Sequence, residues 1–296
     1  MPFNVNDFLV YTYSSLTFLV LAASLIGIWV FESGAKKLQL FFIFVVFGLM
    51  SQHLSVLGVL AIAIYGAIGW VSFRSNWHGF VSFLFYLAFL VISVGLFLHK
   101  VPGIYNWELA KDMVLGTTGA RPYSLWFNLD KPLIAFFGLL WAVPYLDNWQ
   151  DIKFTIKKTL LPFVMMMLVV PYLSVKMGFV TWDPKWQPDL FAAWIFKNLF
   201  LVVLAEEVIF RGFIQMRLRV WMERKGMRSW PAVLVAGILF GLAHYAGGWN
   251  YVFLSSLAGI CYGWAQYRSQ AIEAAIFLHL SLNTVHFLFF TYPGLA

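Results

Sequence analysis

Two adjacent carboxylates, Glu206 and Glu207, lie inside an apolar run and are followed by Arg211. An ionised residue at the centre of a membrane helix costs about 2.5–3.5 kcal/mol to insert. On a helix, Glu207 and Arg211 are four residues apart and can form an ion pair, whereas Glu206 lies about 100° further round. We therefore expect Glu206 to be available for chemistry. A buried structural ion-pair cluster is the alternative interpretation.

Further polar residues occur on two later apolar runs, His244 on one and both His279 and Asn283 on the other. At 1.5 Å per residue, Glu206, His244 and His279 lie about 16, 20 and 12 Å from the expected cytoplasmic ends of their runs. Each residue alone could be an interhelical hydrogen-bonding group. Their convergence at one level predicts a common site.

Hydrolysis of an acyl bond is the chemistry that suits these residues. A buried carboxylate such as Glu206 can act as general base on a water, and a neighbouring neutral histidine can hold that water or protonate the leaving amine. His279 and Asn283, four residues apart, can donate to a tetrahedral oxyanion. The pair of Glu207 and Arg211 would orient the helix and keep Glu207 ionised.

A zinc site is an alternative, because two histidines and one glutamate form a known catalytic ligand set. The chain has no His-Glu-x-x-His motif, His244 and His279 lie on separate runs, and Arg211 engages the second carboxylate. We therefore expect a mechanism without metal or cofactor and keep zinc as the second choice. Serine catalysis is not favoured, because no nearby serine lies in a nucleophile motif.

The composition indicates whether this site lies in water or in a membrane. Of 296 residues, 61% are hydrophobic and 11% charged, and the mean hydropathy is +0.79. We expect an all-α, polytopic transmembrane helical bundle of about 8–10 spans. The net charge of +7 does not indicate nucleic acid, because the basic residues are dispersed in short loops. The apolar runs are 8–31, 38–50, 54–73, 80–98, 132–146, 160–175, 190–216, 231–246, 251–267 and 271–290.

A polar stretch at residues 99–131 divides these runs into two groups, and its prolines and glycines predict irregular backbone there. We expect residues 1–131 to form N-terminal accessory transmembrane helices with a polar loop. Residues 132–296 would form the catalytic helical bundle, with its motif core at 190–290. The basic loop at 217–228 predicts a cytoplasmic position for that loop.

Two Gly-x-x-x-Gly pairs flank His244 in the sequence, Gly237 with Gly241 and Gly259 with Gly263. Small residues at this spacing let membrane helices approach closely. We therefore expect the helices that carry these glycines to pack tightly beside the site.

Three motifs follow one another on successive apolar runs, and they are Glu206-Glu207-x-x-x-Arg211, Phe240-x-x-x-His244 and His279-x-x-x-Asn283. Together they resemble the signature of the CPBP family of intramembrane glutamate proteases. This family comprises the type II, Rce1-like CAAX prenyl endopeptidases and the bacteriocin-processing and Abi-type membrane proteins. The resemblance implies that Glu206 and His244 activate the water. It also implies that His279 and Asn283 form the oxyanion hole, with Glu207 and Arg211 in support.

The resemblance implies less about the substrate. Eukaryotic members of the family remove the last three residues after a prenylated cysteine, whereas many bacterial relatives act on unprenylated peptides or membrane-anchored sorting tails. We expect an intramembrane endopeptidase that cuts near the C-terminus of a membrane-associated or lipid-anchored protein or peptide. Its partners would be that substrate and membrane lipid, with no nucleic acid. We expect a multi-pass protein of the bacterial inner (plasma) membrane. A non-catalytic scaffold or immunity protein is the main alternative, followed by a zinc-dependent hydrolase and a proton-coupled transporter.

Overall fold

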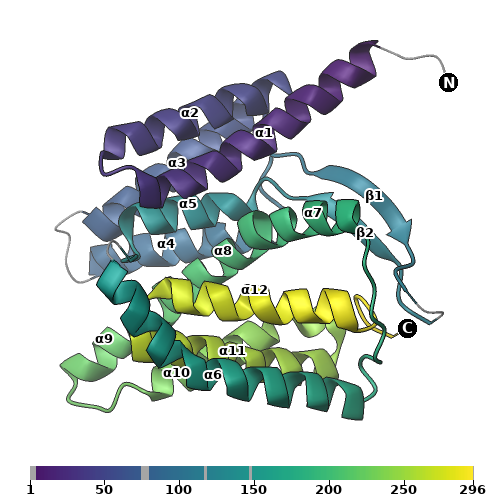
Figure 1. Ribbon diagram of the computed structural model, residues 1–296. Coiled ribbons are helices and arrows are strands. Elements are labelled where there is room, and N and C mark those ends of the chain that lie inside the picture. The colour runs from purple at the N-terminus through teal and green to yellow at the C-terminus, as the bar shows by residue number, and fades with distance from the viewer. Residues whose placement is uncertain (1–4, 75–79, 117–118, 147–148, 296) are drawn as a thin grey trace. The chain divides into compact units, whose positions relative to one another are not determined.

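The computed structural model describes residues 5–74, 80–116, 119–146 and 149–295, and most of them are helical (Figure 1). The predicted all-α class is therefore confirmed. Contacts divide the chain into two compact units. Unit 1 comprises Met1–Leu109, Trp126–Val143 and Phe200–Ala205, and unit 2 comprises Ala110–Leu125, Pro144–Leu199 and Glu206–Ala296. The functional division expected at residue 131 stays a prediction.

Unit 1 is built from helices that pack around α5. Its described helices are α1 (Val5–Val30), α2 (Gly34–Met50), α3 (Val56–Arg74), α4 (Phe80–Phe97) and α5 (Lys131–Trp141). Helix α5 packs against α1, α3 and α4, while α1 also packs against α2 and α3 against α4. Asp130 begins α5 by accepting a hydrogen bond from the Lys131 backbone, and Pro132 stands in the first turn, where no donor is needed. Phe136 of α5 is buried and stacks on Phe41 of α2 with 4.1 Å between ring centroids.

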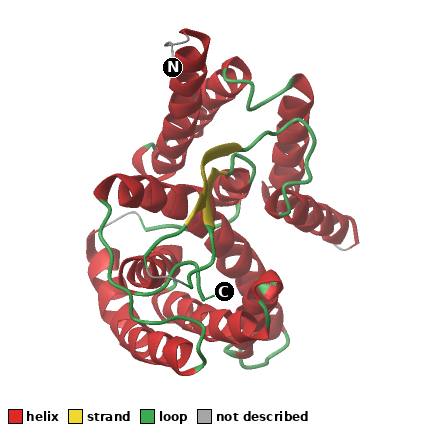
Figure 2. Cartoon of the chain, turned by 90° about the vertical axis from the view of Figure 1, so that its right-hand side faces the viewer, coloured by secondary structure: helices red, strands yellow, loops and turns green. Residues whose placement is uncertain are grey.

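A β-hairpin occupies part of the polar stretch that was expected to be irregular. Strand β1 (Trp107–Met113) pairs with strand β2 (Tyr123–Phe127), as Figure 2 shows in yellow. The side chains of Tyr123, Leu125 and Phe127 are buried, and those between them are more exposed, which is the period-two alternation of a strand. This alternation covers only five residues, too few to distinguish a strand from a loop by sequence pattern.

Unit 2 is organised around α11, which packs against α6, α10 and α12. Its elements are α6 (Trp149–Lys176), α7 (Pro188–Phe196), η2 (Val208–Gln215), α9 (Met216–Arg224), α10 (Pro231–Leu242), η3 (Tyr245–Gly247), α11 (Trp249–Ser269) and α12 (Ile272–Phe289). The segments η1 (Lys197–Val203) and α8 (Leu204–Glu207) belong partly to unit 2 and partly to unit 1, which includes Phe200–Ala205. A Cβ atom on Gly237 would lie 2.6 Å from Ile260, and one on Gly241 would lie 1.9 Å from the Ser256 hydroxyl. The predicted close approach of these helices is confirmed.

Helices long and apolar enough to cross a membrane are present, as predicted. By length and composition five described segments qualify, and they are Val10–Val30, Val56–Arg74, Phe80–Phe97, Gln150–Lys176 and Ile272–Phe289. Two apolar helices are shorter, Lys131–Trp141 and Pro231–Leu242. Every predicted apolar run contains helix in the described residues.

Two runs were predicted to extend too far. We expected a span at 132–146, but α5 ends at Trp141. We also expected a single span at 231–246, but α10 ends at Leu242 and His244 lies in the turn that follows. The backbone N–H of His244 donates to the Gly241 carbonyl, so the helical bond to Phe240 is not made. Gly248, with a φ of +87°, then redirects the chain into α11.

Candidate active site

Glu206 and Glu207 lie on a short α-helical segment, α8, between the π-helical segments η1 and η2. The sequence pattern predicted one uniform helix at 190–216. A π-turn inserts an extra residue and redirects the side chains that follow it, and such turns are frequent at functional sites. The carboxylates therefore lie where the helix changes its winding.

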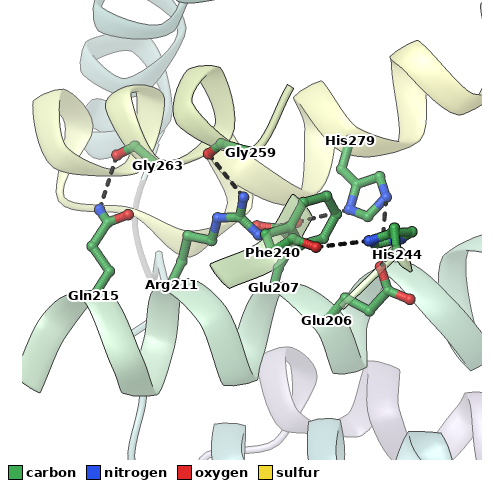
Figure 3. A network of polar contacts seen from close by, with 9 residues as sticks. All are labelled: Glu206, Glu207, Arg211, Gln215, Phe240, His244, Gly259, Gly263 and His279. Carbon is green, nitrogen blue, oxygen red and sulfur yellow. Dashed lines mark hydrogen bonds and ion pairs between the residues drawn. The ribbon is translucent and has the colours of Figure 1, made fainter. Parts of the chain in front are cut away.

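Glu207 and Arg211 form the predicted ion pair, with 3.1 Å between Oε1 and NH1 (Figure 3). Both side chains are fully buried. NH2 of Arg211 also donates to the Gly259 carbonyl at 2.8 Å, which the missing side chain of Gly259 makes accessible. The guanidinium lies over the rings of Phe240 and Tyr262, at 4.5 and 5.2 Å from their centroids. The aromatic rings and the carbonyl together hold a charge that burial alone would make very unfavourable.

His279 contacts the same carboxylate. Its Nδ1 lies 2.7 Å from Oε1 of Glu207, and because Arg211 also donates to that oxygen, the histidine nitrogen is the donor. Its ring stacks on Tyr262, with centroids 4.7 Å apart and an interplanar angle of 14°. The position and orientation of the His279 ring are thus fixed, and its Nε2 is directed away from Glu207.

His244 is held by the backbone at the end of α10. Its Nδ1 lies 2.8 Å from the Phe240 carbonyl, and because a carbonyl only accepts, Nδ1 carries the proton. The imidazole thereby satisfies a carbonyl that the end of the helix leaves without its backbone partner. In the neutral ring, Nε2 has a free lone pair. The side chain of His244 is 21% exposed, which makes it more accessible than those of Glu206 and His279.

The two Nε2 atoms converge on Glu206, as Figure 3 shows. Oε2 of Glu206 lies 4.0 Å from Nε2 of His244 and 3.9 Å from Nε2 of His279. These separations are too long for direct hydrogen bonds, but a water with hydrogen bonds of about 2.8 Å can bridge atoms that far apart. Three side chains of unit 2, from α8, from the turn after α10 and from α12, thus surround a position suitable for a water molecule.

The same separations fit a zinc ion poorly. Tetrahedral zinc with ligands at about 2.0–2.1 Å places its ligand atoms about 3.3–3.4 Å apart. Both measured separations exceed that value. Across the described residues, no group of three or more His, Cys, Asp and Glu side chains could hold a metal ion.

Asn283 lies one turn after His279 on α12, as predicted, but its partner was not predicted. Its Nδ2 donates to Oδ1 of Asn198 at 2.9 Å. Asn198 is buried, whereas Asn283 is partly exposed. Asn198 was not predicted as a site residue, because the prediction for the run 190–216 rested on its charged residues Glu206, Glu207 and Arg211. An amide inside a membrane-grade apolar run is itself a signal that sequence reasoning could have used.

Gln215 extends the network away from the carboxylates. It lies four residues after Arg211, and its Nε2 donates to the Gly263 carbonyl at 2.9 Å and to Gln266 at 2.8 Å. Arg211 and Gln215 therefore bind two carbonyls one turn apart on α11, at the two glycines of one Gly-x-x-x-Gly pair. The pair was expected to serve helix packing, and it also gives these two side chains access to the backbone.

The structure thus brings together Glu206, Glu207, Arg211, His244 and His279, and links Asn283 to Asn198 beside them. Residues 188–285 match the family described as type II CAAX prenyl endopeptidase, Rce1-like. The matched stretch covers about a third of the chain and includes all three motifs, which confirms the family resemblance that they predicted. No curated protein and no solved structure matches the chain.

Proposed function

We propose that this chain is an intramembrane endopeptidase in which Glu206 activates a water to cut a peptide bond. The observation that carries this proposal is the convergence of Oε2 of Glu206 with two imidazole Nε2 atoms at 4.0 and 3.9 Å. The match of this same region to the CAAX endopeptidase family supports the assignment to peptide hydrolysis. The substrate is a membrane-associated or lipid-anchored protein or peptide, cut near its C-terminus.

In this proposal the water lies between Glu206 and His244. The carboxylate takes a proton as the water oxygen attacks the carbonyl carbon of the substrate, and the Nε2 lone pair of His244 orients the water. A new C–O bond forms, and the carbonyl oxygen becomes an oxyanion. When the C–N bond breaks, the proton held by Glu206 passes to the leaving amine. The products are a carboxylic acid and an amine, which ionise to a carboxylate and an ammonium group, and the enzyme is regenerated.

His279 stabilises the oxyanion in this scheme through its Nε2. Because its Nδ1 proton is donated to Glu207, Nε2 can donate only when the ring carries both protons. Asn283 supplies the second donor through its Nδ2. Removing one such donor typically lowers kcat by about 100- to 1000-fold.

The proposal is tested with the purified chain in lipid nanodiscs and internally quenched peptides, with and without a farnesylated cysteine near the C-terminus. We expect hydrolysis by wild type, loss of hydrolysis in Glu206→Gln, and unchanged activity in Glu223→Gln, which alters an exposed glutamate on α9. Hydrolysis that survives in Glu206→Gln contradicts the proposed mechanism.

The metal-free character of the mechanism needs its own test. We expect 1,10-phenanthroline and EDTA to leave the initial rate unchanged, because the spacing of the three side chains suits a water better than zinc. Loss of activity with chelator that is restored by added zinc would establish the zinc-dependent alternative.

A further inference from the structure

Asn198 is a hydrogen-bond partner of Asn283, and the catalytic scheme above does not use it. It lies near the start of η1, its side chain is buried, and its Oδ1 accepts the 2.9 Å hydrogen bond from Nδ2 of Asn283. Asn283 is partly exposed. Burial keeps Asn198 away from a substrate, while Asn283 remains within reach of one.

The contact joins the same two helical stretches that the carboxylates and His279 join. Glu206 faces His279, and eight residues earlier Asn198 bonds Asn283, which lies one turn beyond His279 on α12. On a regular α-helix, residues eight apart differ by about 80° in direction. The wider turn of η1 uses more residues per turn and brings Asn198 back toward the face that carries Glu206. The π-helical segment thus lets both side chains reach α12.

The hydrogen bond determines what Asn283 can offer. A side-chain amide has two N–H groups in one plane, about 120° apart. When one N–H is donated to Asn198, the plane of the amide is fixed and the direction of the second N–H is fixed with it. Without that bond, rotation about the side-chain torsions would spread the second N–H over several directions, and an oxyanion donor is effective only when it is aimed beforehand.

We propose that Asn198 is a positioning residue that aims the second N–H of Asn283 at the oxyanion of the substrate. This inference rests on the proposed function, because it assigns Asn198 a role only through the donor that Asn283 supplies. It adds a buried amide of η1 to the site, outside the three motifs that first indicated it.

The inference is tested by a double-mutant cycle with Asn198→Ala and Asn283→Ala, assayed on the internally quenched farnesylated peptide. We expect Asn198→Ala to lower kcat by about 3- to 10-fold, the effect of one net hydrogen bond, and to leave KM unchanged. In the Asn283→Ala background, Asn198→Ala should have no further effect on kcat, because the group it positions is gone. Thr284→Val, which alters the neighbouring residue on α12, should retain the wild-type kcat.

Thermal unfolding of each variant in detergent separates positioning from stability. If Asn198→Ala lowers kcat equally in both backgrounds, Asn198 acts through the fold and the inference is wrong, although the protease proposal stands. If wild type cleaves no peptide, with or without prenylation, the proposed function fails and the inference fails with it. Unequal effects in the two backgrounds, with KM constant, support the inference.

Discussion

His279 and Glu207 are joined by a 2.7 Å hydrogen bond between Nδ1 and Oε1, and the same oxygen accepts a hydrogen bond from Arg211 at 3.1 Å. The buried carboxylate of Glu207 therefore balances the charge of the Arg211 guanidinium and also orients the His279 imidazole. The second carboxylate, Glu206, faces Nε2 of that imidazole. Two adjacent glutamates thus face opposite nitrogens of one histidine.

The first prediction concerns the buried ion pair. Glu207→Gln leaves the Arg211 charge buried without its carboxylate, and we expect the free energy of unfolding to fall by about 3–5 kcal/mol. The double variant Glu207→Gln with Arg211→Met also removes the unpaired guanidinium charge, and it should recover much of the lost free energy of unfolding. Thermal unfolding in detergent measures both variants.

The same pair of variants separates stability from catalysis. We expect the double variant to remain inactive even when its melting temperature is recovered, because His279 has lost the carboxylate that holds Nδ1. Full hydrolysis in the recovered double variant would show that Glu207 serves the fold alone.

A second prediction follows from the close contact of α10 and α11. Gly241→Ala would place Cβ 1.9 Å from the Ser256 hydroxyl and 2.5 Å from the Val252 carbonyl. Relief of the second contact requires a shift of the α11 backbone, which costs more free energy than rotation of a side chain. We expect a loss of about 1–3 kcal/mol and lower activity, because α10 carries His244 at its end. Gly34→Ala is the control, since nothing lies within 4 Å of its added Cβ. Equal melting temperatures for the two variants would refute this packing argument.

A third prediction concerns pH and unit 1. Burial lowers the pKa of His53, which lies in the turn between α2 and α3, and a hydrogen bond to the Tyr105 carbonyl opposes this shift. Because the folded state favours the neutral ring, the unfolded state binds more protons as the pH falls below the ordinary pKa of 6.5. We therefore expect stability to decrease from pH 6.5 downward, until the pH lies below the folded-state pKa.

His53→Gln, which keeps a hydrogen-bonding side chain without a titrating group, provides the comparison. The difference in melting temperature between wild type and His53→Gln should shrink as the pH is lowered through that window. A difference that is constant from pH 7.5 to 5 would mean that the folded state does not favour the neutral ring.

Much of unit 2 could be predicted from the sequence, because its signals are local. Charges inside an apolar run must be satisfied, and i,i+4 spacing places Glu207 beside Arg211 whatever the surroundings. The apolar runs indicate helices for the same reason, since the length and composition of a membrane helix are set by the bilayer. These features depend on few other parts of the chain.

The features that were missed depend on contacts between distant segments. The π-helical turns around α8 and the hydrogen bond between Asn198 and Asn283 depend on how two helical stretches pack. The spacing of apolar residues in the sequence does not indicate such packing. The end of α10 at Leu242 is similar, because His244 replaces a backbone bond with its own Nδ1 only in the turn that leads to α11. The hairpin at Trp107–Met113 and Tyr123–Phe127 carries too short an alternation to be distinguished from loop.

The central claim is that Glu206 performs hydrolysis rather than helix packing. The most direct measurement compares the N- and C-termini of membrane proteins by mass spectrometry in cells that carry wild type, Glu206→Gln, Glu223→Gln or no copy, at matched protein levels. We predict peptide termini that occur with wild type and Glu223→Gln and are lost equally with Glu206→Gln and with no copy. If Glu206→Gln preserves every wild-type terminus, the glutamate is structural and a non-catalytic scaffold replaces the protease.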